Sequence, residues 1–143
     1  MTTIQMGDRT FPLLFTVAEM LQIQQEIGCT ASELREKVLG YEKDDDDNVT
    51  WGILTDAEKA GKLATLIRIL GNAGLEEMGD APDLTDKWIQ RHMKPGMALA
   101  YGIVAMSEII EGMSMESPGF QEAETGPVDE VLEEQNAKKE PGN

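Results

Sequence analysis

The chain has 143 residues, a length typical of one domain, and its 27 acidic residues against 12 basic ones give it a formal charge of −15. This charge repels nucleic-acid phosphates and anionic membrane surfaces, so we expect neither nucleic acid nor membrane as a partner. The single cysteine excludes an internal disulfide framework, and the longest strongly apolar run, Met97–Met106, is shorter than the roughly 20 residues that cross a bilayer, so we expect a cytosolic protein.

The first segment, Thr2–Phe15, has β-branched and aromatic residues on both sides of the turn-forming pair Gly7-Asp8. This pattern predicts two short strands that form a β-hairpin. Pro12 cannot donate a ladder hydrogen bond, so the second strand should lie at a sheet edge or bend there.

Three later segments have the spacing of a helix capping box, in which a Thr precedes a Glu by three residues. In this motif the Thr hydroxyl accepts from the Glu amide, while the Glu carboxylate accepts from the Thr amide. Three helix starts are therefore predicted. The pairs are Thr16 with Glu19, Thr30 with Glu33, and Thr55 with Glu58.

Each of the first two helices is followed by a glycine suited to a left-handed stop, and the second helix is expected to be short. Apolar residues at helical spacing predict the face that each one buries. In the first helix these residues are Val17, Met20, Leu21 and Ile27, before Gly28; in the second they are Leu34, Val38 and Leu39, before Gly40.

The third helix is the longest apolar-periodic segment, and it should bury one face made of Leu63, Leu66, Ile67 and Leu70. Glycine costs roughly 1 kcal/mol relative to alanine inside a helix. Gly71 and Gly74 therefore either break this helix or allow a neighbour to pack closely, and we favour close packing. A fourth helix is predicted over Leu84–Met93.

The last helix is predicted over Met97–Met113, with Pro95 placed near its start. Its first apolar stripe consists of Leu99, Ile103, Met106, Ile110 and Met113. Further apolar residues widen this stripe until Ser107, Glu108 and Glu111 form the polar remainder, so the helix should be buried on most sides. We take Met97, Tyr101, Val104, Ile109 and Met113 as the candidate partner-binding surface.

Residues 114–143 have a different character, because Ser117-Pro118-Gly119 and Gly126-Pro127 interrupt regular structure. Eight acidic residues and two lysines give this segment a formal charge of −6, which leaves −9 for residues 1–113 out of the total of −15. A disordered acidic tail is predicted. The sequence thus predicts a mainly α domain of four to five helices with an N-terminal β-hairpin over residues 1–113, and a tail over 114–143.

One acidic stretch has a partial resemblance to a calcium-binding loop. Asp44, Asp46 and Asn48 have the alternate spacing of the first three ligands, but Val49 stands where glycine is needed and Thr55 where a carboxylate should be. A solvated loop is the favoured interpretation.

No arrangement of residues supports catalysis. His92 lies near the end of a predicted helix, where a structural or C-capping role is favoured, and Cys29 is favoured as a small buried residue. Neither a phosphate-binding glycine loop nor a nucleophile with a partner base is present. We therefore expect no enzyme activity, no cofactor and no metal.

Nine methionines stand out from the rest of the composition, five of them between Met93 and Met115. Flexible thioethers fill irregular cores, which is the favoured interpretation, but they also form adaptable grooves for apolar helices. A methionine-rich helical surface on an acidic protein would suit an otherwise insoluble partner helix.

The order of these features is similar to a known family. A hairpin of the form IQMGDRTFPLLFT, an immediate helix VAEMLQIQQEIG, further helices and a charged tail resemble the tail assembly chaperones of long-tailed bacteriophages, especially those that infect Gram-positive bacteria. The resemblance covers residues 3–113 and depends on this layout, not on a diagnostic motif.

The resemblance implies a non-enzymatic role in the host bacterial cytoplasm. Members of the family coat the long, helical, aggregation-prone tape measure protein while the tail tube polymerises around it, and they are absent from the finished virion. The tape measure protein and tail tube subunits are thus the implied partners. Self-association is a further expectation, because the last helix has more apolar surface than a small domain covers.

In many members of the family, ribosomes slip backward near the end of the reading frame and add a second domain. The residues Ala137-Lys138-Lys139 permit the slippery heptamer A-AAA-AAG, although two solvated lysines explain them equally well.

Two other functions stay open. An acidic DNA mimic that inhibits a nucleic-acid-binding host protein is compatible with the charge, but much of that charge lies in the tail and one loop. A small enzyme would need a deep pocket around His92 with a perturbed titrating group.

Overall fold

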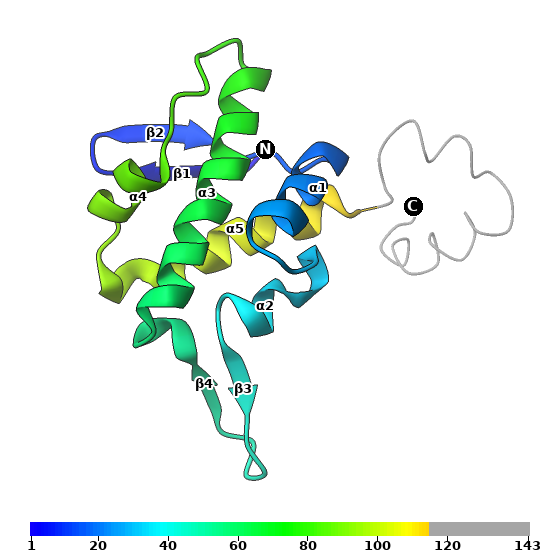
Figure 1. Ribbon diagram of the computed structural model, residues 1–143, viewed down its shortest axis with the longest axis vertical. Coiled ribbons are helices and arrows are strands. Elements are labelled where there is room, and N and C mark those ends of the chain that lie inside the picture. The colour runs from blue at the N-terminus through cyan, green and yellow to red at the C-terminus, as the bar shows by residue number, and fades with distance from the viewer. Residues whose placement is uncertain (115–143) are drawn as a thin grey trace, which may run out of the picture. The chain divides into compact units, whose positions relative to one another are not determined.

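The computed structural model describes residues 1–114, and its fold is mainly helical with an N-terminal hairpin, as predicted (Figure 1). The predicted disordered tail lies outside the described residues, apart from Ser114. Residues Met1–Gly112 form one unit. Its strands are β1 (Thr3–Met6), β2 (Arg9–Pro12), β3 (Tyr41–Lys43) and β4 (Val49–Trp51). Its helices are α1 (Val17–Glu26), α2 (Leu34–Lys37), α3 (Ala57–Glu77), α4 (Asp86–His92) and α5 (Ala98–Gly112), with 3-10 turns η1 (Ala31–Glu33), η2 (Gly52–Leu54) and η3 (Pro95–Met97).

The N-terminal hairpin forms as predicted, and one of its faces belongs to the core. β1 and β2 are antiparallel, with Ile4 opposite Phe11, and both of these side chains are buried together with Met6. Alternate residues of a strand point to opposite faces, so the residues between them remain outside the core. Pro12 ends β2 opposite Thr3, and the next backbone bond between the two segments comes from the Leu13 amide to the Thr2 carbonyl at 2.7 Å.

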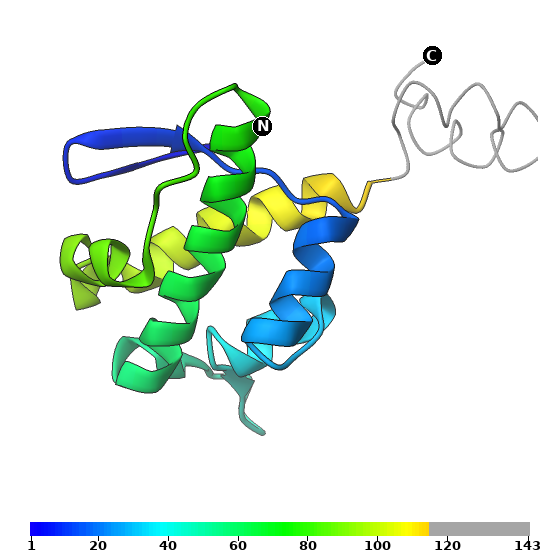
Figure 2. The same cartoon turned by 45° about the horizontal axis from the view of Figure 1, so that its top comes forward.

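Helix α3 is the central element, and it packs against α1, α4, α5 and β2 (Figures 1 and 2). The predicted face is correct, because Leu63, Leu66, Ile67 and Leu70 are all buried. Burying a side chain of this size contributes roughly 1.5–3 kcal/mol. The face of α3 therefore supplies a large part of the core.

Gly71 and Gly74 allow close packing on α3, as predicted. A Cβ atom at Gly71 would lie 2.6 Å from Cδ1 of Leu84 and 2.8 Å from Cε1 of Phe11, and one at Gly74 would overlap the backbone of Pro12. In the same region the Leu14 amide donates to the Leu70 carbonyl at 3.0 Å. The two glycines thus allow the end of β2 and the residues after it to pack directly against the backbone of α3.

Two of the three predicted helix caps are correct. The Thr16 amide donates to Glu19 Oε1 at 2.8 Å, and the Thr30 amide donates to Glu33 Oε1 at 2.9 Å. The third prediction is wrong, because Asp56 and not Thr55 caps α3. Asp56 Oδ1 accepts from the Glu58 amide at 2.9 Å, and a carboxylate is a favoured cap at the positive end of a helix.

The predicted buried face of α1 is partly wrong. Val17 and Leu21 are exposed, whereas Ile23 and Ile27 are buried. Glu19 is also nearly buried, because its carboxylate folds back onto the Thr16 amide. Val17 and Leu21 lie on the side of the helix opposite Glu19 and remain in solvent.

A second hairpin, β3 with β4, was not predicted. It projects from the helices in Figure 1, and Tyr41 is opposite Trp51 with ring centroids 5.2 Å apart. Its turn contains the acidic stretch: Asp44 Oδ1 accepts from the amides of Asp46 and Asn48, both at 2.9 Å. The bond from Asn48 is the main cause that lowers the pKa of Asp44.

Helix α4 is shorter than predicted and begins at Asp86. Thr85 caps it by accepting from the Trp88 amide at 3.0 Å. Leu84 is buried but precedes the helix, where its backbone is fixed by the side chain of Asn72.

One arginine connects three helices at the surface of the core. Arg68 of α3 forms ion pairs with Glu26 of α1 and with Asp86 of α4, and its Nε lies 2.6 Å from Asp86 Oδ1. The hydrogen bond from Arg68 is the main cause that lowers the pKa of Glu26. Thr65 also donates to Asp86, at 2.8 Å.

Candidate functional site

Helix α5 faces the core with its small residues. Ala98, Gly102 and Ala105 are buried at a spacing of four and three residues, followed by Ile109 on the same side. A Cβ atom at Gly102 would overlap Cδ2 of Leu39, which is itself buried. Because the inner face is small, the helix lies close to the elements beneath it.

Four larger residues of α5 form a row in which two side chains pack against the core and two are exposed. Ile103 is 51% exposed and Ile110 is 67% exposed, while Leu99 and Met106 are half-buried. We call these four residues the outer stripe. Their spacing of four, three and four residues keeps them on one side of a helix for about three turns. The helix was predicted to be buried on most sides, and this is correct for Leu99 and Met106, which pack against the core, but wrong for Ile103 and Ile110.

The outer stripe carries no charge. Its neighbours on the exposed side, Ala100 and Ser107, are small and neutral. Glu111 follows Ile110 directly and is therefore turned about 100° away from it. An apolar helix laid on the stripe would therefore meet four uncharged side chains over about three turns.

The other flank of α5 is tied to the N-terminal segment. The Tyr101 hydroxyl donates to the Gln5 carbonyl at 3.2 Å, and Glu108 Oε1 accepts from the Thr2 amide at 2.8 Å. Glu108 is only 3% exposed, so its predicted place on a polar outer face is wrong. Both bonds fix the rotation of α5 and hence the direction of the outer stripe.

The five predicted partner-binding residues are found in different environments. Met97 and Met113 are exposed, Tyr101 and Val104 are half-buried, and Ile109 is buried in the core. Ile109 is therefore not accessible to a partner in the folded chain, and partner binding by the others stays a prediction. The run of Ala98, Gly102 and Ala105 was the sequence signal for the inner face, because small residues at this spacing permit close approach.

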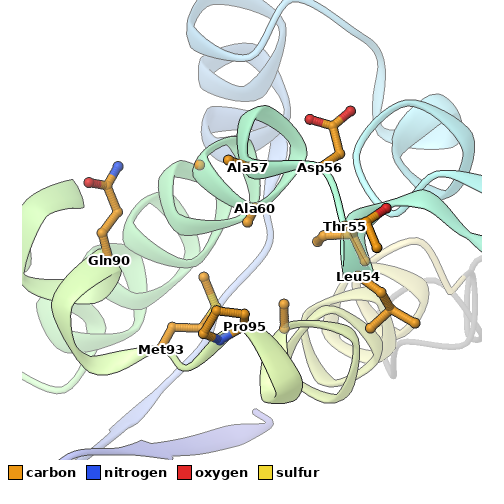
Figure 3. A pocket seen from close by; sticks show the side chains of 11 residues that line it. Leu54, Thr55, Asp56, Ala57, Ala60, Gln90, Met93 and Pro95 are labelled. Atoms are coloured by element: carbon orange, nitrogen blue, oxygen red, sulfur yellow. The ribbon is translucent and has the colours of Figure 1, made fainter.

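A second candidate surface is a pocket of about 500 Å³ between η2, the start of α3 and the connection from α4 to α5 (Figure 3). Leu54 and Thr55 line one side and Met93 and Pro95 the other, with Ala60 of α3 between them. Its walls are mostly apolar, with Asp56 and Gln90 among the polar residues, and its size lies within the range of small-molecule pockets.

His92 and Cys29, the two side chains considered for catalysis, have local structural surroundings. His92 stacks on Trp88 with ring centroids 4.2 Å apart, and its Nδ1 donates to the Trp88 carbonyl at 2.8 Å, in line with a structural role. Burial raises the pKa of the Cys29 thiol, which disfavours the reactive thiolate. Among residues 1–114, no three or more His, Cys, Asp or Glu side chains are grouped to hold a metal ion.

In the part of the chain that the structure describes, no helix combines the length and apolar character needed to cross a membrane. Comparisons of the chain with protein families, with curated proteins and with solved structures found no match.

Proposed function

We propose that this protein is a non-enzymatic chaperone of phage tail assembly, which binds the tape measure protein and keeps it soluble while tail tube subunits assemble. The resemblance in the layout of the chain suggests the biological setting. The observation that carries the proposal is the outer stripe of α5, an apolar row with Ile103 and Ile110 exposed on a strongly acidic protein.

The outer stripe suits a helical client. Helix-binding proteins present apolar side chains that meet the partner at intervals of three and four residues. Leu99, Ile103, Met106 and Ile110 have these intervals. Met106 adds a flexible thioether, which adapts to side chains of different shape. A long helical client with a repeating apolar face could be held by successive copies.

The charge of the chain suits the same role. Each chain has a formal charge of −15, so complexes of this protein with a client repel one another in solution. Since the outer stripe is uncharged, the repulsion acts between complexes and does not oppose contact with the client. The protein would thus add solubility to a client that has little of its own.

Co-expression with the tape measure protein tests the proposal. We expect the client to move from the insoluble to the soluble fraction and to be recovered in a complex. The double variant Ile103→Glu with Ile110→Glu should lose this effect, since it introduces charge into the stripe without changing a buried residue. Val17→Glu with Leu21→Glu is the matched control, because both α1 residues are also exposed. A client that stays insoluble with the unaltered protein would contradict the proposal.

A further inference from the structure

We propose that two copies of this chain pair through α5, with the two helices antiparallel and their outer stripes in contact. The surface is the one that the proposed function assigns to the client. Pairing would cover it while no client is present, and the client would then displace the second copy. Only this displacement step rests on the proposed function; the pairing itself does not.

The order of residues in the outer stripe favours a two-fold contact. The midpoint between Ile103 and Met106 along the helix is also the midpoint between Leu99 and Ile110. A two-fold axis through this point therefore places Ile103 of one copy against Met106 of the other, and Leu99 against Ile110. Each contact joins a β-branched side chain, which is stiff at χ1, with one that is not branched at Cβ.

The residue types also fit a helix pair. Spacing by four and three residues is the repeat that keeps two helices in contact over several turns. Ile occupies one set of positions, and Leu or Met occupies the other. Ala100 and Ser107, on the exposed side of the stripe, are small enough for a second helix to approach closely.

Charge favours a second copy as the occupant. The four residues of the outer stripe carry no carboxylate, so a cationic helix would find no partner group within the stripe itself. Two identical copies need no such partner group. Although each chain has a formal charge of −15, the outer stripe is uncharged, so two copies that meet there bring no ionised group of the stripe into contact.

Charge also favours the antiparallel direction. Residues 114–143, which follow α5 in sequence, have a formal charge of −6. Parallel pairing would start both of these segments at the same end of the helix pair. Antiparallel pairing starts them about 20 Å apart, the length of a 15-residue helix, which exceeds the roughly 8 Å Debye length at physiological salt.

Sedimentation equilibrium of the full chain, without client, tests the pairing. We expect the weight-average mass to rise with concentration from 15.7 kDa towards twice this value, and more steeply at high salt, which screens the remaining repulsion. Ile103→Glu with Ile110→Glu should restore the monomer at every concentration. The control Leu21→Glu, an exposed residue of α1, should pair like the unaltered protein. Circular dichroism verifies that each variant is folded.

Disulfide trapping tests the direction of the helices. Leu99→Cys and Ile110→Cys proteins are prepared separately, mixed and oxidised. Antiparallel pairing predicts a cross-linked heterodimer of the two variants and little homodimer, since the two Leu99 positions would lie roughly 16 Å apart along the helices. A disulfide needs Cα atoms within about 7 Å. The native Cys29 is buried, and the unaltered protein measures its background.

The outcomes separate the parts of the proposal. A monomer at all concentrations overturns the pairing and leaves the stripe free for a client. A dimer that persists in the Ile103→Glu, Ile110→Glu variant overturns the assignment to α5. Homodimers of Leu99→Cys alone overturn the antiparallel direction. Loss of client solubilisation by a protein that still pairs would instead count against the proposed function.

Discussion

Helices α3 and α5 are the two longest helices, and they meet the core in opposite ways. α3 directs large residues such as Leu66 and Ile67 inward, whereas α5 directs Ala98, Gly102 and Ala105 inward and leaves Ile103 and Ile110 outside. The more apolar helix is thus the one with the larger apolar surface in solvent. The difference shows that apolar content alone does not indicate burial when small residues share the helix.

Truncating one large side chain on each helix should give the largest contrast. Leu66 is 1% exposed, so Leu66→Ala should lower the free energy of unfolding by about 2–5 kcal/mol through lost burial and a residual cavity. At concentrations where the chain is a monomer, Ile103→Ala should change it by less than about 0.5 kcal/mol, because half of the side chain is then in solvent. Urea unfolding measures both values. Equal losses would show that the outer stripe is packed.

Replacing a small residue by valine on each side of α5 should show which side is packed against the core. Gly102→Val should lower the free energy of unfolding by about 1–3 kcal/mol, because the added atoms overlap the buried side chain of Leu39. Ala100→Val on the exposed side is the matched control. It should cost less than about 1 kcal/mol, the difference in helix propensity. A tolerated Gly102→Val would contradict the close approach to Leu39.

Removing the buried carboxylate tests how α5 is oriented. Glu108→Ala leaves the Thr2 amide without its acceptor and should lower the free energy of unfolding by about 1 kcal/mol, the lower end of the range for a partly buried donor. Glu108→Gln retains an acceptor oxygen and should be nearly neutral. Thermal unfolding and the exchange rate of the Thr2 amide distinguish the two variants. Identical behaviour would exclude this bond as a source of stability.

Acidification should have the smallest effect, through the ion pairs of Arg68. Arg68 lowers the pKa of Glu26 in the folded chain, so this contribution is present above the ordinary value near 4.5 and is lost as pH falls through the folded pKa. Glu26 is partly exposed, and we expect well under 1 kcal/mol after solvent screening. Arg68→Met should flatten the stability profile in this acidic range, whereas Arg35→Met, at an exposed pair, should not.

Local signals in the sequence predicted much of the fold. The Thr16 and Thr30 caps depend on residues three positions apart, and Gly28, with φ of 91°, ends the first helix as expected. The hairpin around Gly7 follows from its turn residues and the alternation of Ile4 and Met6. Such features are decided by a few neighbouring residues, so they can be read before the tertiary structure is known.

The remaining errors have tertiary causes. The strands β3 and β4 are three residues each, too short for a clear alternation, and their pairing brings Tyr41 and Trp51 together from positions ten residues apart. The spacing in α5 identified the stripe but not its direction. That direction is set by Leu39 against Gly102 and by Thr2 at Glu108, contacts between residues far apart in the chain.

The central claim is that the outer stripe of α5, and not the face of α3, binds an apolar helix. Methyl NMR during a titration with a peptide from the tape measure protein measures this directly. We predict that the methyl signals of Ile103 and Ile110 shift or broaden, whereas those of the buried Ile67 and Ile23 stay in place. Unchanged Ile103 and Ile110 signals, in a sample where the peptide is bound, would contradict the claim.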